Sequence, residues 1–506
     1  MTLSGCFSLV LHTHMPYVRK NGAFPVGEDW LYQVMSDTYI PLLGMLSQLD
    51  HEGVTSCLAL TLTPVLCEQL GDDYVKEKFV EYLETMASRA SRDIRDFEYF
   101  DDAQRRAMAG DYRDNFMRKK LAFLSIGGDL LGAIGEFEDK GLIETMTSSA
   151  THAFLPGLDD RSVRAQVRIG VEAYEARTGR RPAGFWLPEC AYRKGIEEVL
   201  QAEGLKYFLV DPTALGGLPS TAAYLVGDSS VAVLSRSDAT HVNVWDETRG
   251  YPADARYLDS TKYYHNSGLL YWSVTGEGVS IEDKLVYKPD EASRLALHDA
   301  ERFLRDVTRE LEAAPRNGDC ATPLVLASYD TELFGHGWRE GLYWMEILLR
   351  SMQSARSIDL VTPCGYLAMR RPDDRVNLLE TTWGTTRDSS TWFNSDTRWI
   401  WEATNNARDE LYRQLIEPGP PGAGREEALK QAARELLLLQ SSDWPYMVAK
   451  DRAAEYATQR FNAHMERFRL ASGAAGEKGR DLPQTALRRI EETDNIFASL
   501  DLGAFE

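Results

Sequence analysis

Seven short apolar runs, separated by helical stretches, constrain the fold of this chain more than any other feature. They lie at 7–11, 56–62, 184–187, 206–210, 231–235, 323–327 and 376–379. Runs of this length without regular polar alternation are typical of buried parallel strands, which helices cover on both faces. The pattern therefore predicts an α/β fold, an incomplete (β/α)7 barrel that falls short of the eight-stranded form.

Helical patterns interrupt and follow the predicted barrel. Between about 73 and 147 the sequence is charged and helical with no obvious strand, which predicts a helical insertion. Towards the C-terminus, apolar residues recur at spacings of three and four, which is typical of amphipathic helices. We therefore expect a barrel over residues 1–395, interrupted by the insertion, and an α-helical C-terminal domain over residues 396–506.

The charge of the chain disfavours several classes of partner. Its 77 acidic and 56 basic residues give a formal net charge of -21, which repels nucleic acid and anionic membranes and suits a neutral substrate. The six cysteines form no CxxC pair, and the N-terminal segment resembles neither an export signal nor a membrane anchor. We expect a cytoplasmic location and no nucleic-acid or membrane partner, whereas the sequence does not indicate an oligomeric state.

Two carboxylates stand where a barrel of this kind builds its active site. Glu189 follows the run at 184–187, within GFWLPECAY, and Asp330 follows the run at 323–327, within SYDTELFGHGW. Loops beyond the ends of barrel strands bring distant residues together. A retaining glycosidase needs such convergence, because one carboxylate attacks the anomeric carbon while the other protonates the leaving oxygen. Each carboxylate could instead cap the helix that follows its strand.

Histidines accompany both carboxylates. His12 and His14 lie two residues apart in LHTHMPY, so on an extended chain their side chains point the same way. Such a pair can donate hydrogen bonds to sugar hydroxyls, ligate zinc or lie in the core. His336 follows Asp330, but the segment HGWRE does not form an HExxH pattern. We therefore expect neither a metal nor a cofactor.

Aromatic residues in segments without a clear helix pattern suggest stacking surfaces for sugars. Flat exposed rings pack on the apolar faces of pyranoses, although each ring could equally lie in the core. The segment from Trp245 to Tyr257 contains Gly250 and Pro252, which predicts a lid-like loop with Tyr251 at its tip. The candidate stacking residues are Trp245, Tyr251, Trp383, Trp392 and Trp444.

Several ordered segments together resemble glycoside hydrolase family 57. The matching residues are His12, His14 and Pro16, then Trp186 to Glu189, then Asp330 to His336, with further similar segments at 151–158 and 361–367. The resemblance covers residues 9 to about 450. It implies the (β/α)7 barrel, the helical insertion and the helical C-terminal domain, with no cofactor. It also implies Glu189 as the nucleophile and Asp330 as the acid and base.

Within this family, the segments at 244–257 and 441–446 resemble those of the branching-enzyme group. The resemblance implies an enzyme that cleaves α-1,4 linkages of a donor glucan, such as glycogen or amylose, and forms α-1,6 branches on an acceptor chain through a covalent glycosyl-enzyme. The resemblance implies that His12, His14 and His152 line the subsite for the cleaved sugar. The full set of substrate-binding residues that we expect is His12, His14, His152, Trp186, Tyr251, His336, Trp383, Asp443 and Trp444.

The chain departs from the family pattern at two places. Gly337 precedes Trp338 where the family often has two tryptophans, and the stretch after Trp383 reads GTTRD where glycines are usual. We expect both places to lie along the path of donor or acceptor chains, and so to affect transfer specificity. The alternatives are an α-amylase or 4-α-glucanotransferase of the same family, a metal-dependent deacetylase or mannosidase, and a catalytically silent glucan-binding protein.

Overall fold

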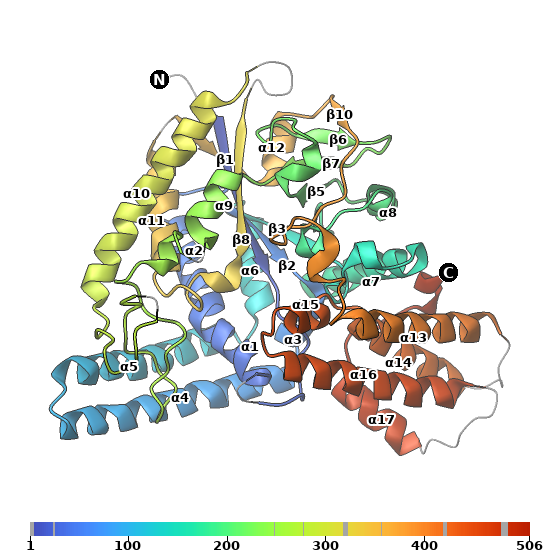
Figure 1. Cartoon of the computed structure of the whole chain (residues 1–506), viewed down its shortest axis with the longest axis horizontal. Helices are drawn as coiled ribbons and strands as arrows, with labels where there is room; N and C mark the ends of the chain where they lie inside the picture. The colour runs from blue at the N-terminus through green and yellow to red at the C-terminus, as the bar shows by residue number, and fades with distance from the viewer. Residues whose placement is uncertain are drawn as a thin grey trace.

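Seven parallel strands form the centre of the molecule (Figure 1). The structure is a computed structural model that describes residues 5–23, 26–246, 248–276, 278–316, 322–355, 357–417, 423–476 and 484–506. Within these residues the strands are, in sheet order, β8 (Leu324–Asp330), β1 (Gly5–Thr13), β2 (Leu58–Leu62), β3 (Ile143–Ser148), β4 (Gly184–Trp186), β5 (Tyr207–Val210) and β7 (Ala232–Ser235).

Three shorter strands complete the sheet. β9 (Ile358–Leu360) pairs with β1, whereas β6 (Tyr224–Val226) pairs antiparallel with β7 and carries β10 (Arg375–Val376) at the edge. The sheet does not close through strand pairing in the described residues. A backbone hydrogen bond from Ser237 N to Leu326 O at 2.7 Å joins the segment just after β7 to the middle of β8. The predicted incomplete (β/α)7 barrel is confirmed.

The helical insertion is shorter than predicted, because β3 occupies part of it. The insertion consists of α4 (Asp73–Tyr99), α5 (Ala103–Ser125) and α6 (Leu130–Asp139), each capped by an aspartate at its N-terminus. Strand β3 reads IETMTS, and its polar residues are buried and hydrogen-bonded: Glu144 accepts from Cys364 N, and Thr145 N donates to Glu138. A strand with this composition lacks the apolar run by which the others were predicted.

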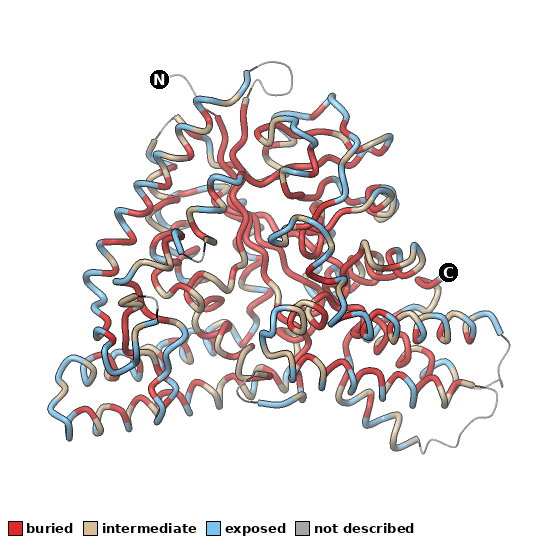
Figure 2. Tube along the Cα trace, viewed as in Figure 1, coloured by how far each residue is buried: buried red, intermediate tan, exposed pale blue. Residues whose placement is uncertain are grey.

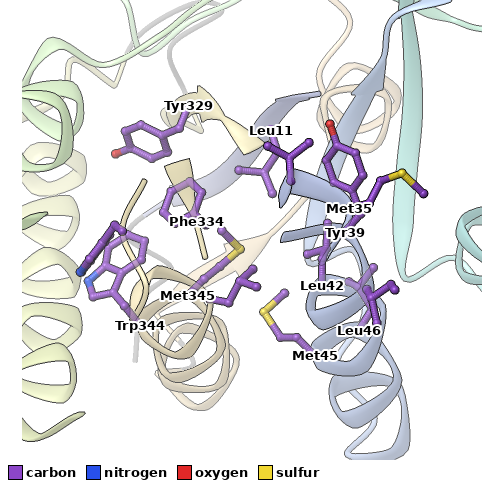
Figure 3. Packing of buried hydrophobic residues seen from close by; sticks show 14 of the residues in the cluster. Leu11, Met35, Tyr39, Leu42, Met45, Leu46, Tyr329, Phe334, Trp344 and Met345 are labelled. Carbon is purple, nitrogen blue, oxygen red and sulfur yellow. The ribbon is translucent and has the colours of Figure 1, made fainter. Parts of the chain in front are cut away.

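The inner face of the curled sheet packs on itself, for example through Val10, Trp186 and Leu234. Helices cover its outer face, so the strands are buried and the outer helical faces are exposed (Figure 2). In chain order they are α1 (Glu28–Val34), the π-helix η1 (Met35–Tyr39), α2 (Ile40–His51), α3 (Pro64–Leu70), α7 (Asp160–Thr178), α8 (Ile196–Ala202), α9 (Asp238–Trp245), α10 (Pro289–Ala313), α11 (Gly341–Ser354) and α12 (Pro363–Met369). Figure 3 shows part of the core, where Leu11 of β1 lies near residues of α2 and α11.

Five helices form the C-terminal region: α13 (Arg398–Ile416), α14 (Ala423–Leu439), α15 (Asp443–Ala449), α16 (Ala454–Ala475) and α17 (Gln484–Thr493). Their apolar faces share a core with α7 and with Tyr17 and Val65 of the barrel. The short helix α15 begins where the C-terminal region meets the barrel, beside His152. None of the helices that the structure describes combines the length and apolar character that crossing a membrane requires.

Candidate active site

The ends of four parallel strands bring the predicted residues together. His12 lies near the end of β1 and is paired in register with Asp330, the last residue of β8. His152 follows β3, and Glu189 lies in a short 3-10 turn, Pro188–Cys190, directly after β4. Because all four strands are parallel, these side chains meet at the C-terminal edge of the sheet, where barrels of this type place their chemistry.

Glu189 is held in a strained backbone conformation with both carboxylate oxygens engaged. Its φ of 63° lies in the left-handed region, which for a residue other than glycine is typical of functional sites. Trp383 N donates to Glu189 O at 2.9 Å, and the Trp383 indole N–H donates to Oε2 at 2.8 Å. The Ser442 hydroxyl donates to Oε1 at 2.8 Å. These three bonds fix the direction of the carboxylate.

Glu189 and Asp330 have different surroundings, and these decide which of the two carboxylates holds a proton. Burial raises the pKa of Glu189 to about 7, while the bonds from Trp383 and Ser442 favour its charged form. Burial, together with the negative charge of Glu189, raises the pKa of Asp330 to about 7. Within the described residues, no donor forms a hydrogen bond with the Asp330 carboxylate. When the pair shares one proton, it therefore favours Asp330 and leaves Glu189 ionised.

A chain of hydrogen bonds fixes the tautomers of two buried histidines. Since Ser442 gives its only proton to the ionised Glu189, its oxygen accepts from His152 Nδ1 at 2.9 Å. The other nitrogen of His152, Nε2, therefore accepts a hydrogen bond from His12 Nε2–H at 3.0 Å. Burial holds the pKa of both histidines well below the usual value, which agrees with neutral rings. Both therefore act as neutral hydrogen-bonding groups.

His14 belongs to a second set of contacts beside this chain. Its ring stacks on that of His152 at 3.9 Å between centroids, and its nitrogens contact Thr63 Oγ1 at 3.1 Å and Asp443 Oδ2 at 3.1 Å. Burial acts to raise the pKa of Asp443, but the neighbouring His14 outweighs it and the pKa is lowered. Asp443 is therefore ionised and accepts from His14.

Two groups of side chains in the described residues have the composition of a metal site. In the first, His14, His152 and Asp443 place ligand atoms within 4.8 Å of one another. Both nitrogens of His152 are already engaged, so a bound ion would have to break the chain that ends at Glu189. The second group, Glu435, His464 and Asp494, lies among the C-terminal helices. Two of its members contact arginines, His464 with Arg460 and Asp494 with Arg467.

Two tryptophans form an aromatic wall around these groups. The Trp186 ring stacks on His12 with centroids 4.5 Å apart and planes within 9°. Trp383 meets Trp186 edge-on at 5.3 Å while it donates to Glu189. Trp186 is fully buried and packs against His12 within the core, whereas Trp383 is partly exposed.

The structure corrects the predicted positions of Tyr251 and Trp444. Tyr251 is only 4% exposed and packs 6.2 Å from Trp338 and 6.1 Å from Trp344, so it is not the tip of a lid. Its segment forms a 3-10 turn, Tyr251–Ala253, that directs the ring inward, where burial of an aromatic side chain is favourable. Trp444 is fully buried and donates to Leu438 O at 2.7 Å. The equally buried Trp392 is also a core residue.

In the described residues, the side-chain contacts of His336 and of the two departures do not include Glu189 or Asp330. His336 Nδ1 is 3.7 Å from Asp37 and lines a separate cavity. Gly337, the residue that departs from the pattern, is partly exposed, whereas Trp338 is 1% exposed and packs against Phe334. The expected effect of this departure on glucan binding stays a prediction. The GTTRD stretch makes a turn in which Arg387 binds buried Asp211 at 3.1 Å.

Sequence reasoning missed three groups that touch the site: Ser442, Tyr39 and Glu332. Burial raises the pKa of Glu332 to about 8, and its Oε1 accepts from Tyr39 at 2.6 Å and from His14 N at 3.2 Å. Glu332 lies two residues after Asp330 in the segment SYDTELFGHGW, so its position in that segment was a signal that could have identified it. No local signal marked Tyr39, whose position depends on the π-helix η1. Helices of this kind often occur at functional sites.

Comparison with known proteins places these observations in a family context. Residues 8–372 match the model of glycosyl hydrolase family 57, and residues 405–505 match the model of the 1,4-alpha-glucan branching enzyme C-terminal region. A 1,4-alpha-glucan branching enzyme of Thermococcus kodakarensis is 35% identical, over 99% of this chain and 79% of its own length.

Two crystal structures show the same arrangement over nearly the whole chain. The branching enzyme of Pyrococcus horikoshii aligns with a TM-score of 0.93 at 34% identity, covering 99% of this chain and 97% of that one. An alpha-amylase of Thermotoga maritima aligns with a TM-score of 0.86 at 25% identity, covering 99% of both chains. The fold is therefore shared by proteins that carry two different activities.

Proposed function

Since this chain belongs to glycosyl hydrolase family 57 and ends in the C-terminal region of its branching enzymes, we propose that Glu189 and Asp330 carry out its reaction as nucleophile and as acid and base. The chain is a 1,4-alpha-glucan branching enzyme of this family. One observation supports the assignment of roles above all: Glu189 accepts two hydrogen bonds through its carboxylate, whereas Asp330 accepts none within the described residues.

The reaction follows from these protonation states. Ionised Glu189 attacks the anomeric carbon of the donor chain, and Asp330 gives its proton to the glycosidic oxygen as the bond to the leaving chain breaks. The product is a glucan joined to Glu189 through a β-glycosyl ester. Asp330, now ionised, removes the proton from the 6-hydroxyl of an acceptor glucose. That oxygen displaces Glu189, so the new linkage is α-1,6 and the anomeric configuration is retained.

We propose α-1,4-glucans, such as amylose and glycogen, as donor and acceptor chains. Neutral His12 can accept a hydrogen bond from an uncharged sugar hydroxyl through Nδ1, which has no partner within the described residues, while His152 holds the His12 ring through Nε2. The partly exposed face of Trp383 beside Glu189 suits stacking on a pyranose. The net charge of -21 supports the proposal that neither nucleic acid nor an anionic membrane is a partner.

The cysteines support a reducing location. Within the described residues all cysteines are free, and four of the five are buried. Free buried thiols without disulfides are typical of proteins of the reducing cytoplasm, which we propose as the location of this chain. Cys320 lies outside the described residues.

Product analysis on amylose tests the proposed function. We expect the chain to form α-1,6 linkages, measured by proton NMR and by debranching, in excess of new reducing ends. Glu189→Gln should abolish both products, because the amide fills nearly the same volume but cannot attack the anomeric carbon. New reducing ends without α-1,6 linkages would favour an α-amylase, and a product of rearranged α-1,4 chains would favour a 4-α-glucanotransferase.

A further inference from the structure

A cavity of about 630 Å³ lies apart from the catalytic carboxylates, between the helical insertion and the segment that follows Asp330. One wall comes from α4 and α5, and the opposite wall from residues 258–270, which lie above the insertion in Figure 1. The third wall joins Asp37 of η1 to the segment 335–339. None of the residues around Glu189 lines this cavity. Its volume is that of a small-molecule site.

Aromatic rings line several sides of the cavity. Tyr82 lies on α4, Tyr112 on α5 and Tyr263 on the opposite wall. Tyr263 is 50% exposed, and no other ring in the described residues packs on it, so its face is open to a ligand entering from solvent. Such rings stack on the apolar faces of pyranoses.

Polar groups of both signs lie between these rings. Burial acts to raise the pKa of Asp37, but Lys119 at 3.2 Å, His336 at 3.7 Å and Arg339 together outweigh it, so the pKa is lowered and Asp37 is ionised. The Arg339 guanidinium stacks 5.0 Å above the Tyr112 ring and makes no hydrogen bond within the described residues. The lining thus offers the carboxylate of Asp37 as a hydrogen-bond acceptor and the N–H groups of Arg339 as donors that have no partner in the described residues.

This mixture favours a neutral polyol over an anion. The cavity contains the guanidinium groups of Arg89, Arg92 and Arg339, but the carboxylates of Asp29 and Asp37 face the same space. A phosphate would meet these carboxylates, whereas sugar hydroxyls both donate and accept and so satisfy both signs. Rings for stacking together with paired donors and acceptors are the chemistry of a carbohydrate site.

The cavity also contacts the catalytic centre through two shared elements. Asp37 and Tyr39 lie two residues apart on η1, and Tyr39 binds Glu332 while Asp37 faces the cavity. On the other element, Glu332 lies four residues before His336, which lines the cavity. A ligand in the cavity would therefore contact the two segments that also hold Tyr39 and Glu332.

We propose that this cavity is an accessory binding site for an α-1,4-glucan chain, separate from the subsites around Glu189. The inference rests on the α-glucan substrate proposed above. A chain held at both places is tethered, so its second contact is intramolecular and long glucans bind more tightly than short ones.

Titration of maltohexaose into the full chain carrying Glu189→Gln tests this proposal without turnover. We expect calorimetry to show two classes of site, and crystals soaked in maltohexaose to show sugar against Tyr263. Adding Tyr263→Ala should weaken one class by about 3- to 10-fold, the value of one lost stacking contact, and leave the other unchanged. Ser260→Trp, which fills the cavity, should remove the same class.

Leu285→Ala is the matched control, since Leu285 is 64% exposed on the same connection and does not line the cavity. A single class of site that neither Tyr263→Ala nor Ser260→Trp alters, with no sugar in the cavity, would overturn the proposal. Binding of inorganic phosphate there without maltohexaose would overturn it in favour of an anion site. If the wild-type chain forms no α-1,6 linkage but maltohexaose occupies the cavity, the proposed function fails and the accessory site stands.

Discussion

Ser442→Ala should raise the pKa of Glu189 and move the pH dependence of branching. Ser442 is fully buried, and its hydroxyl donates to Glu189 Oε1 at 2.8 Å while it accepts from His152. Alanine fills nearly the same space but removes a donor that favours the carboxylate over the carboxylic acid. Burial, which already raises this pKa to about 7, then acts with less opposition.

The size of the effect follows from the charge on the acceptor. A hydrogen bond to a charged group contributes about 1.5–3 kcal/mol, and 1.36 kcal/mol corresponds to one pKa unit, so the pKa should rise by about one to two units. Below pH 7 the ionised fraction of Glu189, and with it the rate, should fall by about 10- to 100-fold. The loss should shrink as pH rises until deprotonation of Asp330 limits the rate.

The assay is the initial rate of α-1,6 linkage formation from amylose between pH 4 and pH 9. Ser472→Ala is the matched control, because it also removes a buried serine hydroxyl. This hydroxyl accepts from Gln414 at 2.9 Å within the C-terminal helices and does not contact Glu189. The control should lose some thermal stability and keep the wild-type pH profile. A folded Ser442→Ala protein with an unchanged profile would refute the reasoning.

Asp330→Asn should lower the rate on amylose by about 10²- to 10⁴-fold, the usual contribution of general acid catalysis. A glycosyl fluoride should still label Glu189 of this variant, as detected by mass spectrometry, because fluoride leaves without a proton. Absence of the label would contradict the assignment of Asp330 as the acid. Prolonged chelation should leave branching unchanged, and loss of activity that zinc restores would favour a metal site. Glu332→Gln can keep the bonds from Tyr39 and His14 through its amide oxygen. Since burial raises the pKa of Glu332 from its usual value to about 8, the wild-type chain loses stability as pH rises towards 8. The variant should therefore match the wild type in melting temperature at pH 4 and exceed it at pH 8, and an equal difference at both would contradict this.

The strands that lead to Glu189 and Asp330 were predictable because each contains an apolar run. Both faces of β4 and β8 are covered, so their sequences show uninterrupted runs that end shortly before Glu189 and Asp330. Strand β3 was missed for the opposite reason. Its buried Glu144 and Thr145 are satisfied by groups elsewhere in the fold, and a sequence pattern cannot show where such partners lie.

Aromatic residues in loops were the least predictable part of the site. Trp383 and Tyr251 both occur in segments with little regular structure, yet one donates to Glu189 and the other packs against Trp344. Their difference depends on a backbone turn that directs each ring outward or inward. The sequence shows that an aromatic residue is present but not whether its ring is buried, and burial of a ring is favourable in any part of the core that can accommodate it.

The boundary predicted at residues 395 and 396 stays a prediction, but the active site extends across it. Ser442 N donates to His152 O at 2.9 Å, and Ser442 and Asp443 supply contacts to Glu189 and His14 at the start of α15. The position of α15 depends in turn on the C-terminal core, in which Trp444 is fully buried. The C-terminal helices therefore complete the catalytic centre that the barrel begins, and a change that loosens their core should reach Glu189 through Ser442. Contacts between residues 253 positions apart, such as Ser442 with Glu189, arise only from this packing, which explains why no local pattern revealed them.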